Sequence, residues 1–442
     1  MINILYLKRF LFLAFCLFSL QLTAQDLLGY EAILSGSSNS VSSINNHHPN
    51  DRISFVELST KDIPLLKDCS DSLYKVRYLG LKFENQSQLD SLCQSLYLFP
   101  HVEALVFKEF RIRNDTLQPV GMLHLDDTFY KHNQLRAIAF EGNTKINLAG
   151  EISKLNKLPM LYYLIFKVFP VQYIPKGLKE NHQLKGISLN YKPLLDQFEF
   201  PSQLIEIAIS ATSPSDRVDH VLDILPNKER IETLRLSHFT VKDTAIYSDR
   251  GFRSLKTLVL NFNDIDDPGR LMNNFSGSTQ LKYLNYSNGP LKQISSSLFQ
   301  FKELRELQIK NTKSAFNLPK ELGQLKKLRL LDLSDNAIDS LPHALFQLTA
   351  LTNLNLSYNK LGFLSDELRK LTSINTLQLQ GNKLQHIPFT INGLHRLHEL
   401  NVQANPIVTL PSFAGLKNLE ILNLSYCNLS RLPEDIGTLL SL

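Results

Sequence analysis

The chain has 442 residues, of which 43% are hydrophobic and 20% are charged, and its formal net charge is +5. The small positive charge is not gathered into a basic run, so we expect no nucleic acid as a partner. This length is greater than that of one compact domain, but it suits an array of repeats, which grows in one dimension.

The N-terminus has the pattern of an export signal. Lys8 and Arg9 precede the apolar run 10–20, and a Leu-Thr-Ala sequence follows that is suited to cleavage. This run is too short to span a bilayer, and no later stretch is long enough. We therefore expect a signal peptide over residues 1–24 and an exported chain that is extracellular, at the cell surface or in the periplasm, without membrane insertion after cleavage. An uncleaved anchor, a buried helix and lipid attachment at Cys16 are the alternatives.

Residues 25–52 contain Ser, Gly, Asn and His clusters, which predict a flexible lead-in.

From Ile53 onward, apolar residues at positions 1, 4 and 6 of successive segments define a repeat. The segments are irregular over 53–280, where their length changes from one to the next. The sixteen predicted repeats start at residues 53, 76, 102, 135, 161, 184, 204, 231, 255, 281, 304, 328, 351, 374, 397 and 419.

The repeats are most regular over residues 281–442. The starts at 328, 351, 374 and 397 are equally spaced, which indicates one small structural unit stacked many times. Each repeat begins with apolar and polar residues in alternation, as in Leu354-Asn355-Leu356, the period of a strand with one buried face. A strand this short must pair with its equivalent in the next repeat, so the pattern predicts a parallel sheet.

Position 9 of the repeat is often asparagine, whose amide can pair with backbone groups where the chain leaves the strand. This predicted structural ladder comprises Asn263, Asn336, Asn359, Asn382 and Asn405, with Cys427 in the final repeat. Other residues interrupt it at Phe169, Lys192, Phe239, Gly289 and Thr312. Several repeats then carry Leu-Pro or Ile-Pro, so the return limb should start extended and become helical or 3₁₀ only afterwards.

These residues resemble the 23-residue form of the leucine-rich repeat family, L-x-x-L-x-L-x-x-N-x-L-x-x-L-P. The resemblance implies an α/β solenoid: an arc with a parallel sheet on its concave face and short helical, 3₁₀ or extended segments on its convex face. It also implies irregular leucine-rich repeats over 53–280 and regular ones over 281–442. The chain stops at Leu442, where another repeat would begin, so we expect a truncated array; capping by dimerisation or fraying are the alternatives.

Two cysteines lie at nearly equivalent points of adjacent repeats. Cys69 belongs to the repeat that starts at residue 53 and Cys93 to the repeat that starts at residue 76. They could therefore stack within bonding distance, and an exported chain permits a disulfide. The preferred interpretation is two small buried apolar side chains. Cys427 is expected to be a free thiol.

The sequence contains no motif of phosphate binding, zinc-protease, serine-hydrolase or Cys-x-x-Cys chemistry. His395 and His398 straddle a repeat boundary, so we do not expect them to share a metal ion. The acidic run 263–269 lacks the spacing of a calcium loop and is predicted to be a polar turn. We therefore expect no metal, no cofactor and no enzymatic activity.

The face of the predicted sheet is the candidate binding surface. Position 5 points outward from the strand. It is apolar or small at Val106, Ala139, Ile165 and Ala208 and becomes polar further along the chain. The predicted partner-binding residues are this polar column and two flanking tyrosines, namely Asn285, Gln308, Asp332, Asn355, Gln378, Asn401, Asn423, Tyr358 and Tyr426. The apolar half could be a separate site, or be covered by the excursions after Ile112 and Thr212.

These observations favour a bacterial recognition module that binds a protein partner at the cell surface or in the envelope. The amides and tyrosines would hold an extended polypeptide through hydrogen bonds and buried ring area. A glycan-binding surface protein is one alternative. A sensor ectodomain or the targeting arm of a longer protein is another. Exposed strand positions also favour short polar residues without any ligand, which is the structural alternative for the column.

Overall fold

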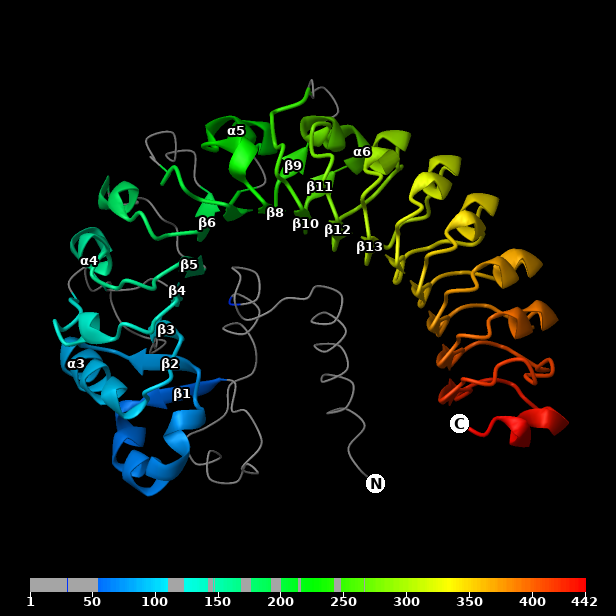
Figure 1. Ribbon diagram of the computed structural model, residues 1–442, viewed down its shortest axis with the longest axis horizontal. Coiled ribbons are helices and arrows are strands. Elements are labelled where there is room, and N and C mark those ends of the chain that lie inside the picture. The colour runs from blue at the N-terminus through cyan, green and yellow to red at the C-terminus, as the bar shows by residue number, and fades with distance from the viewer. Residues whose placement is uncertain are drawn as a thin grey trace. The chain divides into compact units, whose positions relative to one another are not determined.

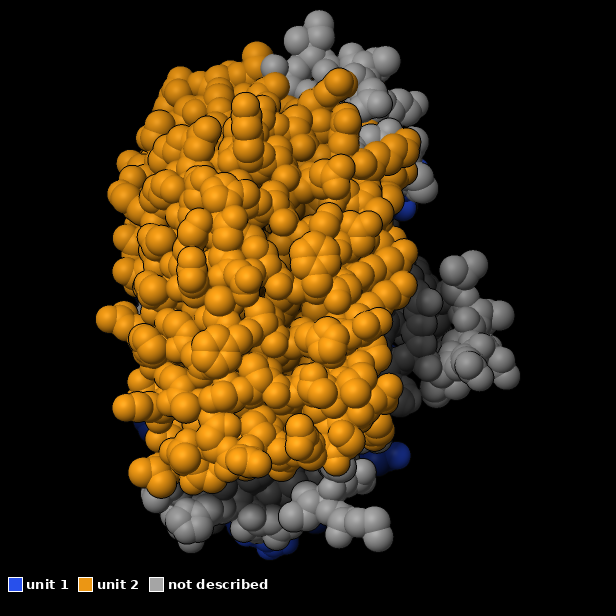
Figure 2. Space-filling model, turned by 90° about the vertical axis from the view of Figure 1, so that its right-hand side faces the viewer, with its two compact units in different colours: residues 1–216, 224–227 blue, residues 217–223, 228–442 orange. Residues whose placement is uncertain are grey.

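The computed structural model describes residues 30, 55–109, 123–141, 146, 148–167, 176–191, 200–213, 216–241, 248–265 and 267–442. The predicted signal peptide therefore lies outside the described residues, as does the lead-in except for Tyr30. The chain forms two compact units, coloured separately in Figure 2. Unit 1 comprises residues 1–216 and 224–227, and unit 2 comprises residues 217–223 and 228–442.

The described residues of unit 1 form seven parallel strands, whose order in the sheet follows the chain. They are β1 (Val56–Ser59), β2 (Tyr78–Phe83), β3 (Ala104–Glu109), β4 (Ala137–Glu141), β5 (Tyr163–Lys167), β6 (Gly186–Tyr191) and β7 (Glu206–Ala211). The return limbs carry η2 (Thr60–Lys75), α3 (Gln86–Ser95), η3 (Leu96–Leu98), η4 (Phe129–Lys131), α4 (Leu148–Leu155) and η5 (Lys176–Glu180).

Unit 2, in the part that the structure describes, has nine parallel strands, again in chain order, and a small second sheet formed by β9 and β11. The nine are β8 (Thr233–Ser237), β10 (Thr257–Asn261), β12 (Tyr283–Ser287), β13 (Glu306–Lys310), β14 (Leu330–Asp332), β15 (Asn353–Asn355), β16 (Thr376–Gln378), β17 (Glu399–Asn401) and β18 (Ile421–Asn423). The small sheet pairs β9 (Thr240–Val241) with β11 (Asp264–Ile265).

The return limbs of unit 2 are short helices on the side opposite the strands (Figure 1). They are α5 (Val218–Ile224), which lies in unit 2 except for its last residue, η7 (Lys228–Arg230), α6 (Pro268–Leu271), η8 (Met272–Phe275), η9 (Ser296–Gln300), η10 (Lys320–Gln324), η11 (His343–Gln347), η12 (Asp366–Lys370), η13 (Phe389–Gly393) and η14 (Glu434–Thr438). Proline precedes η10, η11, η13 and η14 directly with extended backbone, as the Leu-Pro and Ile-Pro pattern predicted.

Equivalent repeat positions pair with one another across the sheet. Leu331 is aligned with Leu354, and Leu354 with Leu377. The side chains at positions 4 and 6 point into the core, and each fully buried leucine contributes about 1.5–3 kcal/mol. In unit 1, phenylalanines replace several of these leucines at position 6. Phe140 stacks between Phe107 and Phe166 at ring-centroid distances of 5.4 and 5.7 Å. The parallel sheet and the solenoid architecture predicted from the period are confirmed.

Each position-9 asparagine links its own repeat to the preceding one by hydrogen bonds to the backbone. Asn359 accepts a hydrogen bond from the Ile338 N–H at 3.1 Å and donates to the carbonyls of Leu333 and Leu356 at 2.9 and 3.0 Å. Asn336, Asn382 and Asn405 make the equivalent bonds, and Asn263 pairs in the same way with the repeat before it. In the last described repeat, the Cys427 thiol donates to the Val402 carbonyl at 3.4 Å, a weaker contact than that of an amide.

One interruption of the ladder is filled by a different side chain. Gly289 stands where asparagine would be, and a Cβ atom there would lie 2.1 Å from the Asn263 carbonyl oxygen. In the same repeat, Tyr286 replaces the usual aliphatic residue at position 6, and its hydroxyl donates to the Pro290 carbonyl at 2.5 Å, close to the carbonyls of Asn263 and Ile265. The tyrosine hydroxyl therefore takes the place of the missing amide.

Candidate functional site

The polar column of position 5 lies on the sheet face of unit 2, but much of it is buried. Asn285, Gln308, Asp332 and Gln378 are at most 8% exposed, whereas Asn355, Asn401 and Asn423 are half-buried. The position-5 side chains therefore do not form a uniformly open column. Neighbouring strands bring these side chains against one another, and their lateral contacts exclude solvent.

The side-chain oxygens of the column complete the ends of the strands. The Oδ1 atoms of Asn355, Asn401 and Asn423 each accept the backbone N–H two residues later, at 3.1 Å. Asp332 accepts from Ser334 in the same way, at 3.0 Å. Because these strands are short, the side chain supplies the acceptor that a longer strand would obtain from its neighbour.

The amide nitrogens of the column link adjacent repeats. Asn285 donates to Gln308 at 2.9 Å, and Gln378 donates to the Glu399 carboxylate at 2.6 Å. Asn423 donates to the Gln403 side chain at 3.1 Å. These bonds give the column a structural role, which reduces the number of amide groups that are open to a partner.

Position 8 forms a second column, along the rim where the chain leaves each strand. The following residues of this rim have left-handed backbone, with φ from 54° to 64°: His238, Phe262, Asn288, Asn311, Asp335, Tyr358, Ala404 and Tyr426. The position-8 N–H donates to a carbonyl of the next repeat, as Tyr358 does to Gln380 at 2.7 Å. Such backbone is costly for bulky residues, and strain of this kind tends to occur at functional sites.

The aromatic residues of this rim are strongly exposed. Phe262, Tyr358 and Tyr426 are 52%, 58% and 82% exposed. The Tyr358 ring lies against Gly381, where a Cβ atom would come within 2.6 Å of the ring, so the glycine provides the space. The rim therefore presents aromatic surface in fixed orientations beside the polar column.

A stacked pair at the beginning of the rim was missed from the sequence. The rings of His238 and Phe262 are parallel within 5° with centroids 5.0 Å apart. Burial, with a smaller effect of the Arg235 charge, lowers the pKa of His238 and favours the neutral imidazole. The signal was their spacing of one repeat length, which places both at position 8 of adjacent repeats.

A half-buried acid on the unit 2 face was also missed. Glu306 lies at position 3 of its repeat, the first residue of β13, and is aligned with Tyr283 on one side and Leu330 on the other. Burial raises its pKa to about 7, because both neighbours shield it from water without neutralising its charge. From the sequence alone, a glutamate at a strand position is expected to be a solvated charge. Only the packing of the neighbouring strands shows that the pKa of Glu306 is raised.

On the apolar half of the face, in unit 1, a residue of the lead-in packs against the strands. Val106, Ala139 and Ile165 are fully buried in a cluster that includes Tyr30 from the lead-in. The excursion after Ile112 lies outside the described residues. The apolar surface is therefore already occupied by a residue of the same chain, which the sequence did not indicate.

The cysteines and histidines of the sequence analysis do not form a site. No disulfide joins Cys69 to Cys93, and both thiols are buried. The structure therefore contradicts the possible disulfide between these two residues. His395 and His398 contact separate backbone carbonyls, those of Gly415 at 3.1 Å and Arg396 at 2.7 Å. Within the described ranges, no three His, Cys, Asp or Glu side chains are grouped to hold a metal ion.

Comparison with known families agrees with the repeat geometry. The family described as "Leucine-rich repeat region" matches residues 281–402, and two further leucine-rich-repeat families match residues 418–439 and 253–272. The chain is a leucine-rich-repeat protein. In the described part of this leucine-rich-repeat chain, no helix has the length and apolarity needed to cross a membrane.

Individual relatives cover limited parts of the leucine-rich-repeat chain. Toll-like receptor 4 of Bos taurus is 34% identical over 90 residues, which is 20% of this chain and 10% of the receptor. Adenylate cyclase of Schizosaccharomyces pombe is 42% identical over 60 residues, which is 14% of this chain and 4% of the cyclase. The chain therefore spans only a small part of the length of these curated relatives.

A solved structure resembles the leucine-rich-repeat chain over most of its length. The match to a leucine-rich-repeat protein of Leptospira interrogans covers 82% of this chain and 92% of the Leptospira chain, with 22% identity and a TM-score of 0.53. This likeness establishes the fold.

Proposed function

We propose that this leucine-rich-repeat chain is a non-enzymatic recognition module that binds an extended segment of a protein partner along unit 2. The observation that carries the proposal is the position-8 rim, where Tyr358 and Tyr426 project exposed rings from left-handed backbone. Aromatic side chains held in fixed positions supply contact area at low entropic cost, and tyrosines are frequent binding hot spots.

The polar column adds directional contacts beside the rings. Asn355 and Asn401 use their Oδ1 atoms within the chain, and within the described residues their Nδ2 groups donate to no protein acceptor. These amide donors can bind the backbone carbonyls of an extended peptide. The remaining predicted contact residues, Asn285, Gln308, Asp332, Gln378 and Asn423, serve mainly to support the surface.

The setting of this recognition belongs to the same proposal. The pattern of residues 1–24 favours export, and we infer that the partner is met at a cell surface or in the envelope of a bacterium. A signal peptide would leave a mature chain that starts at Gln25, which sequencing of the mature N-terminus tests. An unprocessed chain retained in the cytoplasm would contradict export. A sensor ectodomain or targeting arm of a longer protein would use the same surface.

The experiment is affinity capture from an envelope extract of the source organism with the full chain as bait. The test variant is Tyr358→Ala with Tyr426→Ala. Alanine already occupies position 8 with φ of 55° at Ala404, so the backbone accepts it. The matched control is Tyr97→Ala in unit 1, which removes an equally exposed ring (74%) far from the rim in sequence.

We expect the double variant to lose at least about tenfold in affinity for the captured protein while the control retains it. Equal capture by wild type, double variant and control would remove the rim from the site. Displacement of the partner by soluble polysaccharide would instead favour the glycan alternative. Substituting Asn355 or Asn401 by lysine is a poorer test, because it also removes the strand-end hydrogen bonds.

A further inference from the structure

Unit 1 contains a notch formed by four aligned side chains on its sheet face. Position 3 of the repeats, which is the first residue of strands β2, β3, β4 and β5, carries Tyr78, Ala104, Ala137 and Tyr163, and these residues are direct partners across the strands. Two methyl groups thus lie between two large rings. With strands about 4.8 Å apart, the gap between the tyrosines accommodates one aromatic ring.

The wall of the notch at Tyr163 is fixed by the repeat array itself. The Tyr163 hydroxyl donates to the Glu206 carboxylate at 3.1 Å, across the intervening strand β6. The residue of β6 beneath the ring is Gly186, where a Cβ atom would come within 2.8 Å of Tyr163. The glycine lets the ring reach its partner, so this wall does not depend on what fills the notch.

Tyr30 fills the notch in this structure. Its ring centroid lies 6.3 Å from that of Tyr78, edge-on, and 5.5 Å from that of Tyr163. The side chain is fully buried. It belongs to the lead-in, well before Phe55 at the start of the array. Tyr30 therefore reaches this surface as a side chain from outside the repeats.

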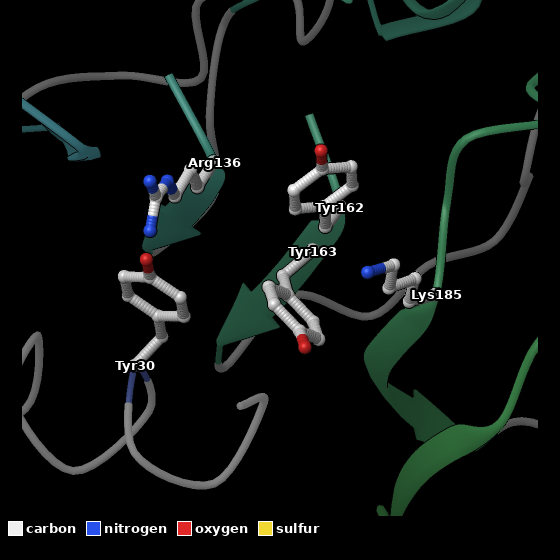
Figure 3. Close-up of a pocket in the computed structure, with 5 residues that line it drawn as sticks. All are labelled: Tyr30, Arg136, Tyr162, Tyr163 and Lys185. Atoms are coloured by element: carbon white, nitrogen blue, oxygen red, sulfur yellow. The ribbon is translucent and has the colours of Figure 1, made fainter. Parts of the chain in front are cut away.

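A cavity of about 330 Å³ continues from the Tyr30 ring, lined by Tyr30, Arg136, Tyr162, Tyr163 and Lys185 (Figure 3). The Tyr30 hydroxyl points toward the Arg136 guanidinium (Figure 3), which also lies 3.8 Å from Glu103. Burial raises the pKa of Tyr30, so its hydroxyl is neutral and brings no charge to the cation.

The second cation of the cavity lies over an aromatic face. Lys185 Nζ is 4.3 Å from the Tyr162 ring centroid. The cavity therefore combines two cations with aromatic walls next to a ring-sized notch. A ligand that places an aromatic residue in the notch and a carboxylate in the cavity would use groups that Tyr30 alone does not satisfy.

We propose that the notch is a recognition socket for an aromatic residue with a neighbouring carboxylate on an extended peptide, and that Tyr30 occupies it as an exchangeable internal ligand. The socket belongs to unit 1 and the rim to unit 2, so this proposal does not rest on the function proposed above. A tethered ligand has an effective concentration of the order of millimolar, so it competes with a peptide in solution.

The test uses the full chain and a fluorescein-labelled peptide with the sequence of residues 25–36, in which Glu31 follows Tyr30. Fluorescence polarisation compares wild type with the Tyr30→Ala chain. We expect the Tyr30→Ala chain to bind this peptide at least about tenfold more tightly than wild type does. Tyr30→Phe keeps the ring and should behave as wild type. A peptide with alanine for tyrosine should not bind.

A Tyr30→Ala chain that melts cooperatively but does not bind the peptide would overturn the proposal and leave Tyr30 as a fixed part of the core. If that variant fails to fold, limited proteolysis of the wild-type chain still tests whether Tyr30 is exchangeable. Chymotryptic cleavage at Tyr30 should be slow and should accelerate as the tyrosine peptide, but not its alanine version, is added. A cleavage rate that saturating peptide leaves unchanged would equally overturn it.

Discussion

Substitution of Asn359 by alanine tests the account of the position-9 ladder. The side chain is 7% exposed and forms hydrogen bonds with three backbone groups: the Ile338 N–H and the carbonyls of Leu333 and Leu356. Each net hydrogen bond contributes about 0.5–1.5 kcal/mol, so Asn359→Ala should lower the free energy of unfolding by about 3 kcal/mol. The loss should be local, because stability in a repeat array is a sum over neighbouring units.

The matched control is Asn355→Ala, which removes the same residue type from the same repeat. Asn355 is half-buried and accepts from Ser357, a role that water can take over, so its loss should stay below about 1 kcal/mol. Urea unfolding followed by circular dichroism gives both values, and hydrogen exchange at the Ile338 amide locates the effect. Equal losses for the two variants, or an unchanged Ile338 exchange rate in Asn359→Ala, would refute the reasoning.

Three further substitutions test other features of unit 2. Burial raises the Glu306 pKa to about 7, so the folded chain binds this proton more tightly than the unfolded chain, and stability falls as pH rises from about 4.5 through about 7. Glu306→Gln should therefore stabilise by about 1–2 kcal/mol at about pH 8, after allowance for partial exposure, and not at about pH 4; equal gains in urea titrations at both would contradict this. Gly289→Ala should cost about 3 kcal/mol in the same titration, because its Cβ meets a backbone carbonyl, while Gly362→Ala, with open space around it, should cost nothing. Cys427→Asn should raise the melting temperature by restoring amide donors toward the Val402 carbonyl, and an unchanged value would argue against the ladder extending to this repeat.

The sequence predicted the repeat and its strand positions because each depends on short-range periodicity. The alternation of apolar and polar residues in Leu354-Asn355-Leu356 indicates a strand with one buried and one open face. A constant period then places equivalent residues of neighbouring repeats side by side. The observed register, Leu331 with Leu354 and Leu354 with Leu377, follows from that period alone. Family comparison over residues 281–402 supports the same conclusion.

The candidate site was predicted only in part. Tyr358 and Tyr426 were predicted contact residues. The repeat spacing places His238 and Phe262 at equivalent positions, but the stacking of their rings depends on the left-handed backbone that each residue adopts, which residue type does not show. The use of Asn355 Oδ1 at the strand end also became visible only in the structure. These features depend on backbone geometry and on neighbouring strands, not on residue type.

The sequence by itself determined the solenoid, because every repeat needs only its own residues and those of the next to close its core. Only the tertiary structure decided which surfaces are free. It placed Tyr30 in the notch between Tyr78 and Tyr163, and it let the Tyr286 hydroxyl replace the amide missing at Gly289. Tyr30 lies outside the repeats, and the contact of Tyr286 with Pro290 lies within one repeat that departs from the others, so the periodic pattern carries no information about either.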